Sequence, residues 1–321
     1  MEHAFAPDFY VVGAAKAGTT ALRSWLSAHP DVFLPTTAEP GHFACVGTDP
    51  RPADGLFDAQ SVLRMTPDAR DYAALYAPAN GRMTGDCSSV YLHSLDAAQR
   101  IAAARPDARI IILLRNPTDR AYAQYRQHIR AGLEPIRDFR AAVYAESNRL
   151  KTGWSWAHAY TGASVYAPKI ARFQQHFPHE QILFLRHEDL RDRPQVAWVQ
   201  VLTHLGLSPC PLPARSQTQM PHPQPGPVQN LLNRVISSQL RAGFVRALAA
   251  SARPVPPLTL STRVELSALF APDLRRTAAL TGLDLSDWLR PPAHQTCLDQ
   301  LREHFDGRGP HGTIGQTKFA A

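Results

Sequence analysis

The sequence predicts an α/β fold, in which a central parallel sheet is flanked by helices. Residues 9–12 and 110–114 are uninterrupted apolar runs of strand length, typical of strands buried on both faces of a sheet. After each run the chain turns and continues into a segment with helical spacing of its apolar residues. Strands that alternate with helices in this way favour a parallel sheet.

The same pattern continues along most of the chain, so we expect one domain over residues 1–290. Further helices are predicted over residues 20–28, 139–150 and 195–205, and further strands over residues 32–34 and 182–185. Residues 208–228, rich in proline and glutamine, are expected to form a long irregular loop within the domain. Residues 291–321 are expected to be a partly mobile tail.

Composition sets limits on the function. The chain has 321 residues, of which 44% are hydrophobic, enough to bury a sizeable core. Its net charge of +7 suits an anionic ligand. A surplus of arginine is explained equally well by solubility or by a general affinity for nucleic acid. We expect no nucleic-acid partner. No apolar run reaches membrane-spanning length and the first residues lack a secretory pattern, so the expected location is cytoplasmic. The 4 scattered cysteines indicate neither a zinc site nor a disulfide framework.

The loop after the first apolar run has the features of an anion site. Gly13 ends the run, and the loop continues as Ala15, Lys16, Ala17, Gly18, Thr19 and Thr20. Glycines let backbone N–H groups turn inward, and a helix that begins near Thr19 adds the positive end of its dipole. We therefore expect these residues to bind an anion.

The position of the lysine argues against a nucleoside-triphosphatase loop. Lys16 lies before Gly18, whereas that loop has its lysine directly after the last glycine. The second apolar run leads into Arg115 and not into a carboxylate that would hold magnesium. Metal-assisted phosphoryl transfer is therefore not expected, and we predict no metal site.

A second anion site is predicted where residues 110–114 end. Arg115 follows directly, Pro117 stands where a first helical turn begins, and Arg120 comes one turn later. Ligands of open parallel sheets bind at such strand ends. The planar fork of a guanidinium suits phosphate because it can bond it in two places.

Together these segments resemble the sulfotransferases that use 3′-phosphoadenosine 5′-phosphosulfate (PAPS), including bacterial members and the heparan sulfate N- and 3-O-sulfotransferases. The family's 5′-phosphosulfate loop is matched by Lys16, Gly18, Thr19 and Thr20, and its 3′-phosphate motif by Arg115, Pro117, Arg120 and Tyr125. The resemblance implies a nucleotide-binding, P-loop-like fold with PAPS as the sulfate donor. Ala123 replaces the family serine that helps to hold the 3′-phosphate. The loss of this hydrogen bond would weaken cofactor binding by about 1 kcal/mol or more.

The resemblance also implies a catalytic base. Residues 38–43 resemble a family segment whose glutamate is held to be that base, and Glu39 falls on this glutamate. Sulfuryl transfer needs a base within reach of the acceptor proton, which a carboxylate or an imidazole can supply. Gly41 stands where the family has histidine, so His42 is displaced by one position and is the second candidate.

Three further segments resemble the family. In residues 81–92, Asp86 and Ser88 lie beside the acceptor in relatives or merely cap a strand end, and Cys87 replaces a lysine that some members carry. The aromatic segment around Trp154 and Trp156 borders the acceptor cleft in the family, although such residues are more often core or lid packing. Arg253, just before the prolines at positions 254, 256 and 257, is a further candidate contact to the cofactor's 5′ end.

These features predict a PAPS-dependent sulfotransferase that acts by direct in-line transfer. Glu39 would take the acceptor proton, Lys16 and the helix N-terminus would neutralise the leaving phosphosulfate, and Arg115 would anchor the 3′-phosphate. Saccharides, lipids, peptides and small natural products all stay open as acceptors, as does the oligomeric state. Two other classes stay open: a divergent nucleotide kinase and a non-catalytic nucleotide-binding module, the latter suggested by Ala123, Gly41 and Cys87.

Overall fold

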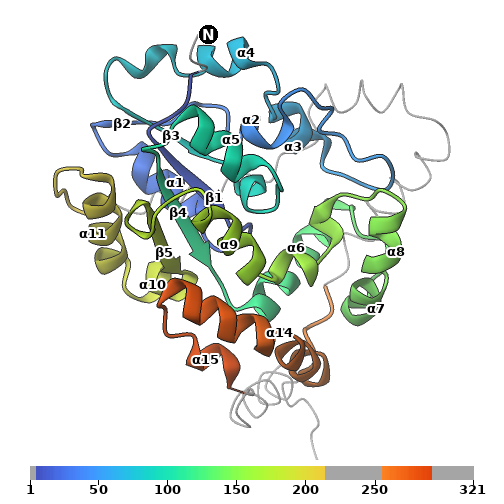
Figure 1. Cartoon of the computed structure of the whole chain (residues 1–321). Helices are drawn as coiled ribbons and strands as arrows, with labels where there is room; N and C mark the ends of the chain where they lie inside the picture. Colours follow the sequence, from blue (N-terminus) through green and yellow to red (C-terminus); the bar gives the residue numbers. More distant parts are fainter. Residues whose placement is uncertain (1–4, 214–254, 291–321) are drawn as a thin grey trace, which may run out of the picture.

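The computed structural model describes residues 5–213 and 255–290, and it contains a five-stranded parallel sheet (Figure 1). The strands are β1 (Phe9–Gly13), β2 (Val32–Phe33), β3 (Met83–Cys87), β4 (Arg109–Leu114) and β5 (Ile182–Arg186). Their order is β2-β3-β1-β4-β5, and every neighbouring pair is parallel. The predicted α/β class and the four predicted strands 9–12, 32–34, 110–114 and 182–185 are confirmed.

Helices connect the strands and follow the last one. They are α1 (Thr19–Ser27), α2 (His42–Cys45), α3 (Ala59–Arg64), α4 (Ala69–Ala74), α5 (Ala97–Ala104), α6 (Pro117–Ala131), α7 (Phe139–Tyr144), α8 (Glu146–Lys151), α9 (Ala167–Gln174), α10 (His187–Asp192), α11 (Pro194–Leu205), α14 (Leu260–Thr281) and α15 (Ser286–Leu289). The helix predicted over 139–150 is divided at Ala145, where α7 ends and α8 begins. Gly206 ends α11 in a left-handed conformation, which glycine adopts without a Cβ clash.

Helices cover both faces of the sheet. In Figure 1, α5 and α9 lie in front of the strands and α1 lies behind them. The ring of Trp25 on α1 meets that of Trp198 on α11 at 6.3 Å, so these two helices share a face. The central strands are therefore enclosed, and all of β1 is buried. Each fully buried large apolar side chain contributes about 1.5–3 kcal/mol, which holds the strand ends, and the loops that follow them, in fixed positions.

Residues after 254 join the same core. Leu266, Phe270 and Leu274 of α14 belong to the hydrophobic cluster that contains the strands. Asp273 accepts hydrogen bonds from the backbone N–H groups of Tyr166 and Ala167, at 2.7 and 3.0 Å, and so caps α9. The single domain over 1–290 stays a prediction, because residues 214–254 lie outside the described part of the chain; most of the predicted loop 208–228 and the whole tail 291–321 lie there too.

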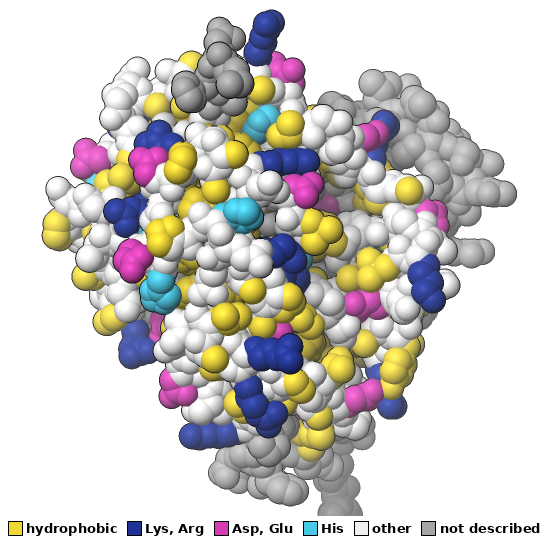
Figure 2. All heavy atoms as spheres, in the orientation of Figure 1, with side chains coloured by type: hydrophobic (Ala, Val, Ile, Leu, Met, Phe, Trp, Pro, Cys, Tyr) yellow, Lys and Arg dark blue, Asp and Glu magenta, His cyan; other side chains and the backbone are white. Residues whose placement is uncertain are grey.

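The charged side chains can be followed on one face of the molecule. On the face shown in Figure 2, basic and acidic side chains of the described residues are interspersed. Within residues 5–213 and 255–290, no helix combines the length and the apolar character needed to cross a membrane.

Candidate active site

The loops after β1, β3 and β4 meet at one edge of the sheet. β1 pairs in parallel with β3 on one side and with β4 on the other, with Val11 opposite both Cys87 and Ile111. The three carboxyl ends therefore lie side by side, and the chain after each strand emerges at the same edge. This is the position at which open parallel sheets bind ligands.

The β1–α1 loop turns sharply before α1. Lys16 has φ 70° and Gly18 has φ 106°, both in the left-handed region. A Cβ on Gly18 would lie 3.3 Å from Nδ1 of His187, so the loop packs tightly here. Among the described residues, no side chain caps α1, and its first turn holds no acidic residue. The first N–H groups of α1 are thus available to an anion.

The Lys16 side chain lies among charged groups of the site. Its ammonium donates to Oε1 of Gln127 on α6. Burial lowers the pKa of Lys16, as do the nearby charges of Arg120 and Arg115, whereas the carboxylate of Glu39 raises it. The structure therefore brings together four of the predicted site residues that lie far apart in the sequence.

Arg115 lies directly above the end of β4. Its Nη1 donates to the backbone carbonyl of Lys16 at 3.0 Å, which ties the second motif to the first loop. The hydroxyl of Tyr166 donates to the Arg115 carbonyl at 2.8 Å and fixes the backbone. In the described part of the chain the Lys16 carbonyl is the one acceptor of this half-buried guanidinium, so most of its donors can face a ligand.

Arg120 is enclosed by other parts of the chain. Its guanidinium is fully buried and donates to Oγ of Ser164 at 2.6 Å, to the Tyr160 carbonyl at 3.1 Å and to the Ala15 carbonyl at 3.4 Å. These acceptors are all protein atoms, and one of them belongs to the anion loop. These contacts favour a positioning role for Arg120 beneath the loop, and its contact to the cofactor stays a prediction.

Glu39 lies on the segment between β2 and α2, with its backbone in the left-handed region at φ 56°. Oγ of Ser89 donates to its Oε2 at 3.0 Å. Burial raises the pKa of Glu39 above the usual glutamate value, while the Ser89 hydrogen bond and the charges of Arg64 and Lys16 act in the opposite direction. A carboxylate with a raised pKa is a stronger base, as the predicted role requires.

A buried network supports the Glu39 segment from below. The Gly41 N–H donates to Oγ of Ser88 at 3.0 Å, and that hydroxyl donates to Oδ1 of Asp86 at 2.5 Å. The hydroxyls of Tyr72 and Tyr91 donate to the other Asp86 oxygen at 2.8 and 2.6 Å. Asp86 is fully buried, and burial raises its pKa. Asp86 and Ser88 therefore anchor the segment that carries Glu39, in addition to any capping of the strand end.

His42 is held in the core. Its Nδ1 lies 2.8 Å from the Thr66 carbonyl, and its ring stacks on Tyr72 with centroids 4.3 Å apart. Burial lowers its pKa. The structure gives the imidazole these core partners, which favours Glu39 over His42 as the base. Cys87 is likewise buried, and burial raises the pKa of its thiol.

Sequence reasoning missed two supporting residues. Gln127, which binds Lys16, lies on the same face of α6 as Arg120 and Ala123, at helical spacings of seven and four residues, so the periodicity of the motif could have indicated it. His187 directly follows β5, and its Nδ1 lies 3.1 Å from the Ala17 carbonyl. Arg253 lies outside the described residues.

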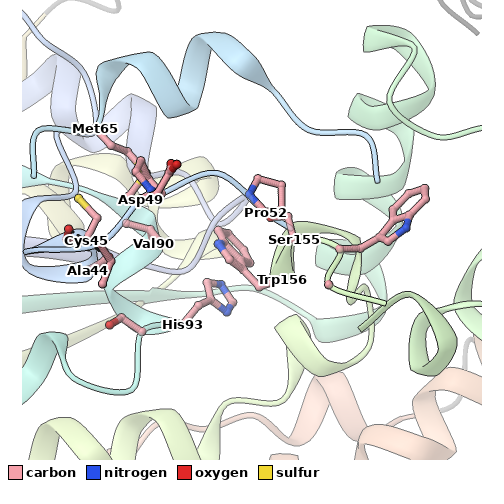
Figure 3. A pocket seen from close by; sticks show the side chains of 14 residues that line it. Ala44, Cys45, Asp49, Pro52, Met65, Val90, His93, Ser155 and Trp156 are labelled. Atoms are coloured by element: carbon pink, nitrogen blue, oxygen red, sulfur yellow. Dashed lines mark hydrogen bonds between the residues drawn. The ribbon is translucent and has the colours of Figure 1, made fainter. Parts of the chain in front are cut away.

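A pocket of about 320 Å³ opens beside the Glu39 segment (Figure 3). Ala44, Met65 and Val90 form one side, and Pro52, Ser155 and Trp156 lie opposite them. The structure thus places the predicted aromatic segment 154–156 at a cavity and not only in the core.

Three comparisons relate the chain to known proteins. A model described as the sulfotransferase family matches residues 7–210. The bifunctional heparan sulfate N-deacetylase/N-sulfotransferase 3 of Mus musculus is 28% identical over 306 residues, 88% of this chain and 31% of the mouse protein. The corresponding protein 1 of Caenorhabditis elegans is 28% identical over 190 residues, 59% of this chain and 20% of that protein. The chain thus spans about a fifth to a third of these curated relatives.

Among solved structures, the sulfotransferase from Alicyclobacillus acidocaldarius superposes with a TM-score of 0.73 and 29% identity. The match covers 89% of this chain and 100% of that one.

Proposed function

The chain belongs to the sulfotransferase family and is an enzyme of sulfuryl transfer, and we propose that its donor is PAPS and its acceptor a hydroxyl or an amine. The names of the heparan sulfate N-sulfotransferases point to nitrogen as one acceptor atom in relatives. A cytoplasmic location is part of this proposal and is tested by cell fractionation.

The residues at the sheet edge fit an anionic donor. The cations Arg120 and Arg115 lower the pKa of Lys16, so positive charge is concentrated around the loop, and a bound anion would relieve that repulsion. The uncapped N-terminus of α1 adds N–H donors. We assign the 5′ end of the donor to Ala15 through Thr20, and the 3′-phosphate to the guanidinium of Arg115.

The protein's own groups would then perform the proton and charge chemistry. When bound, PAPS supplies an electrophilic sulfur attached to a phosphate leaving group. Glu39 accepts the proton of the acceptor at its carboxylate, which Ser89 orients. Lys16 and the α1 N-terminus stabilise the negative charge that develops on the leaving-group side. Arg120 holds the loop from beneath through the Ala15 carbonyl.

The observation that carries this proposal is the convergence of Glu39 with Lys16. The two residues come from segments after different strands, yet each charge shifts the pKa of the other. Such opposed pairs with shifted pKa values are characteristic of catalytic sites.

The Glu39→Gln variant tests the assignment of the base. We expect kcat to fall by roughly 10²–10⁴, the usual contribution of a general base, while the affinity for 3′-phosphoadenosine 5′-phosphate (PAP) stays the same. The assay follows PAP released from PAPS with a panel of alcohols, phenols and amines. Unchanged rates would contradict the role of Glu39. PAP binding without transfer by the native protein would indicate the non-catalytic binding module, and binding only with magnesium would favour the kinase alternative.

A further inference from the structure

The pocket described above lies beside the segment that carries Glu39, the proposed base. Val90 lines it and directly follows Ser89, whose hydroxyl donates to Glu39. A Cβ on Gly41, two residues after Glu39, would lie 3.1 Å from Met65 and 3.3 Å from Val90. Met65 and Val90 therefore place the cavity beside the backbone of the segment that carries Glu39.

The walls of the cavity combine apolar and aromatic side chains with the uncharged polar side chains of Thr48, Ser94 and Ser155. Ala44, Met65 and Val90 form one side, and Trp156 lies across from them (Figure 3). The Trp156 ring stacks on His93 with centroids 3.8 Å apart and an interplanar angle of 16°. A preformed apolar wall binds apolar surface with little ordering cost.

Among the described residues, no lysine or arginine side chain lines the cavity, and Asp49 is the one acidic residue that does. Asp49 is already paired with Arg51, Nε to Oδ1 at 2.9 Å. Burial, together with the charges of Lys169, Arg120 and Arg172, holds the pKa of His93 well below its usual value, which favours the uncharged imidazole. Sulfate and carboxylate groups of a polyanion would find no partner here, and unpaired charges are costly to desolvate.

We propose that the acceptor is an uncharged alcohol or phenol with a compact apolar or aromatic body, and not a polyanionic saccharide. This rests on the proposed function of the site. The body fills the cavity between Met65, Val90 and Trp156, with the hydroxyl toward Glu39. The hydroxyl oxygen forms the new bond to sulfur, the bond between sulfur and the 5′-phosphate oxygen breaks, and the hydroxyl proton goes to Glu39. The products are a sulfate ester and PAP.

The cavity size agrees with such a body. At about 320 Å³ it lies at the lower end of the range of about 300–1,000 Å³ that holds small organic ligands. One or two fused rings fill such a volume.

The test compares 2-naphthol with N-deacetylated heparosan, a polyanionic amine, as acceptors for the native full-length protein. PAP release from PAPS is measured at equal acceptor concentrations. We expect 2-naphthol to be sulfated at least about tenfold faster than the polysaccharide. Faster sulfation of the polysaccharide would overturn the proposal. Calorimetric titration with 2-naphthol, with and without PAP, is run in parallel, and the absence of saturable binding in both would overturn it as well.

The design separates this inference from the proposed function. Failure to bind PAP in a separate titration would contradict the assignment of the donor, whereas PAP binding with no response to 2-naphthol would contradict the acceptor class alone.

Substitutions at Met65 locate the acceptor in the cavity. Met65→Lys inserts a cation at similar side-chain length, and Met65→Leu keeps the wall apolar. We expect Met65→Lys to lower kcat/KM for 2-naphthol at least about tenfold, and Met65→Leu to change it less than about threefold, with PAP affinity constant in both. Val196→Lys on α11, at an exposed apolar position, is the matched control and should have no effect. An unchanged kcat/KM in a folded Met65→Lys protein would contradict binding in this cavity.

Discussion

The N-termini of α1 and α6 lie at the same edge of the sheet but are built differently. α1 follows β1 and begins after Gly18, with no side-chain cap among the described residues and no acidic residue in its first turn. α6 follows the neighbouring strand β4, and the side chain of Asn116 accepts hydrogen bonds from the N–H groups of Thr118 and Asp119 at 3.0 and 3.3 Å. Asp119 adds a negative charge to that first turn and pairs with Arg263 of α14 at 2.7 Å.

The difference indicates two modes of anion recognition. The N–H groups of α1 are left for a ligand, so backbone atoms and Lys16 recognise the anion there. The first turn of α6 is satisfied by the chain itself, so any phosphate beside it depends on the Arg115 side chain. The following changes test this distinction, from the largest expected effect to the smallest.

Gly18→Asp would give α1 the kind of terminus that α6 has. The new carboxylate would compete for the first N–H groups, and a side chain is strained at φ 106°. We expect PAP affinity to fall by at least about 100-fold, or about 2.7 kcal/mol, measured by calorimetry. Gly206→Asp is the matched control, since Gly206 also has positive φ and its Cβ would meet open space. Equal PAP affinity in both variants would show that the α1 terminus does not bind the donor.

Arg115→Lys keeps the charge beside α6 but removes the planar fork. We expect PAP affinity to fall about tenfold, because an ammonium cannot make two parallel bonds to a phosphate. Thermal unfolding should change little, since Arg115 has one protein acceptor in the described chain.

Arg120→Lys provides the contrast. Three buried acceptors lose their partner there, so stability should fall by about 3 kcal/mol or more. A loss of stability in Arg115→Lys together with a loss of PAP affinity in a stable Arg120→Lys protein would exchange the roles assigned to the two arginines.

Asn116→Ala would remove the cap of α6. The unfolding free energy should fall by about 1 kcal/mol, the usual value of an N-cap, in a urea titration. Tighter PAP binding by this variant would mean that the Asn116 side chain and the phosphate compete for the same N–H groups of α6. That result would contradict recognition of the phosphate by Arg115 alone.

Ser89→Ala tests how the loop after β3 sets the pKa of Glu39. If Glu39 is the base, transfer requires its carboxylate, so kcat/KM should fall as the pH drops through the pKa of Glu39, which burial raises above the usual value. The Ser89 hydrogen bond favours the carboxylate and lowers that pKa. Its loss should therefore move the acidic limb of the pH profile to higher pH. A shift to lower pH, or none, would contradict the assignment of this limb to Glu39.

Local patterns predicted the parts of this molecule that short segments determine. The apolar runs at 9–12 and 110–114 correctly predicted two central strands. The two anion sites around Lys16 and Arg115 stay predictions. The role of Arg120 could not be read in this way, because its acceptors Ser164 and Tyr160 come from a segment about 40 residues later. The Asp86 network depends likewise on Tyr72 and Gly41, which tertiary packing brings together.

The central claim is that the loop around Lys16 binds the 5′ end of PAPS while α6 serves as support. Calorimetric titration with PAP, without magnesium, tests it on the native protein, Lys16→Ala and Asn116→Ala. The account predicts binding by the native protein, at least about tenfold weaker binding by Lys16→Ala, and unchanged affinity in Asn116→Ala. No binding by the native protein, or equal affinity in Lys16→Ala, would contradict it.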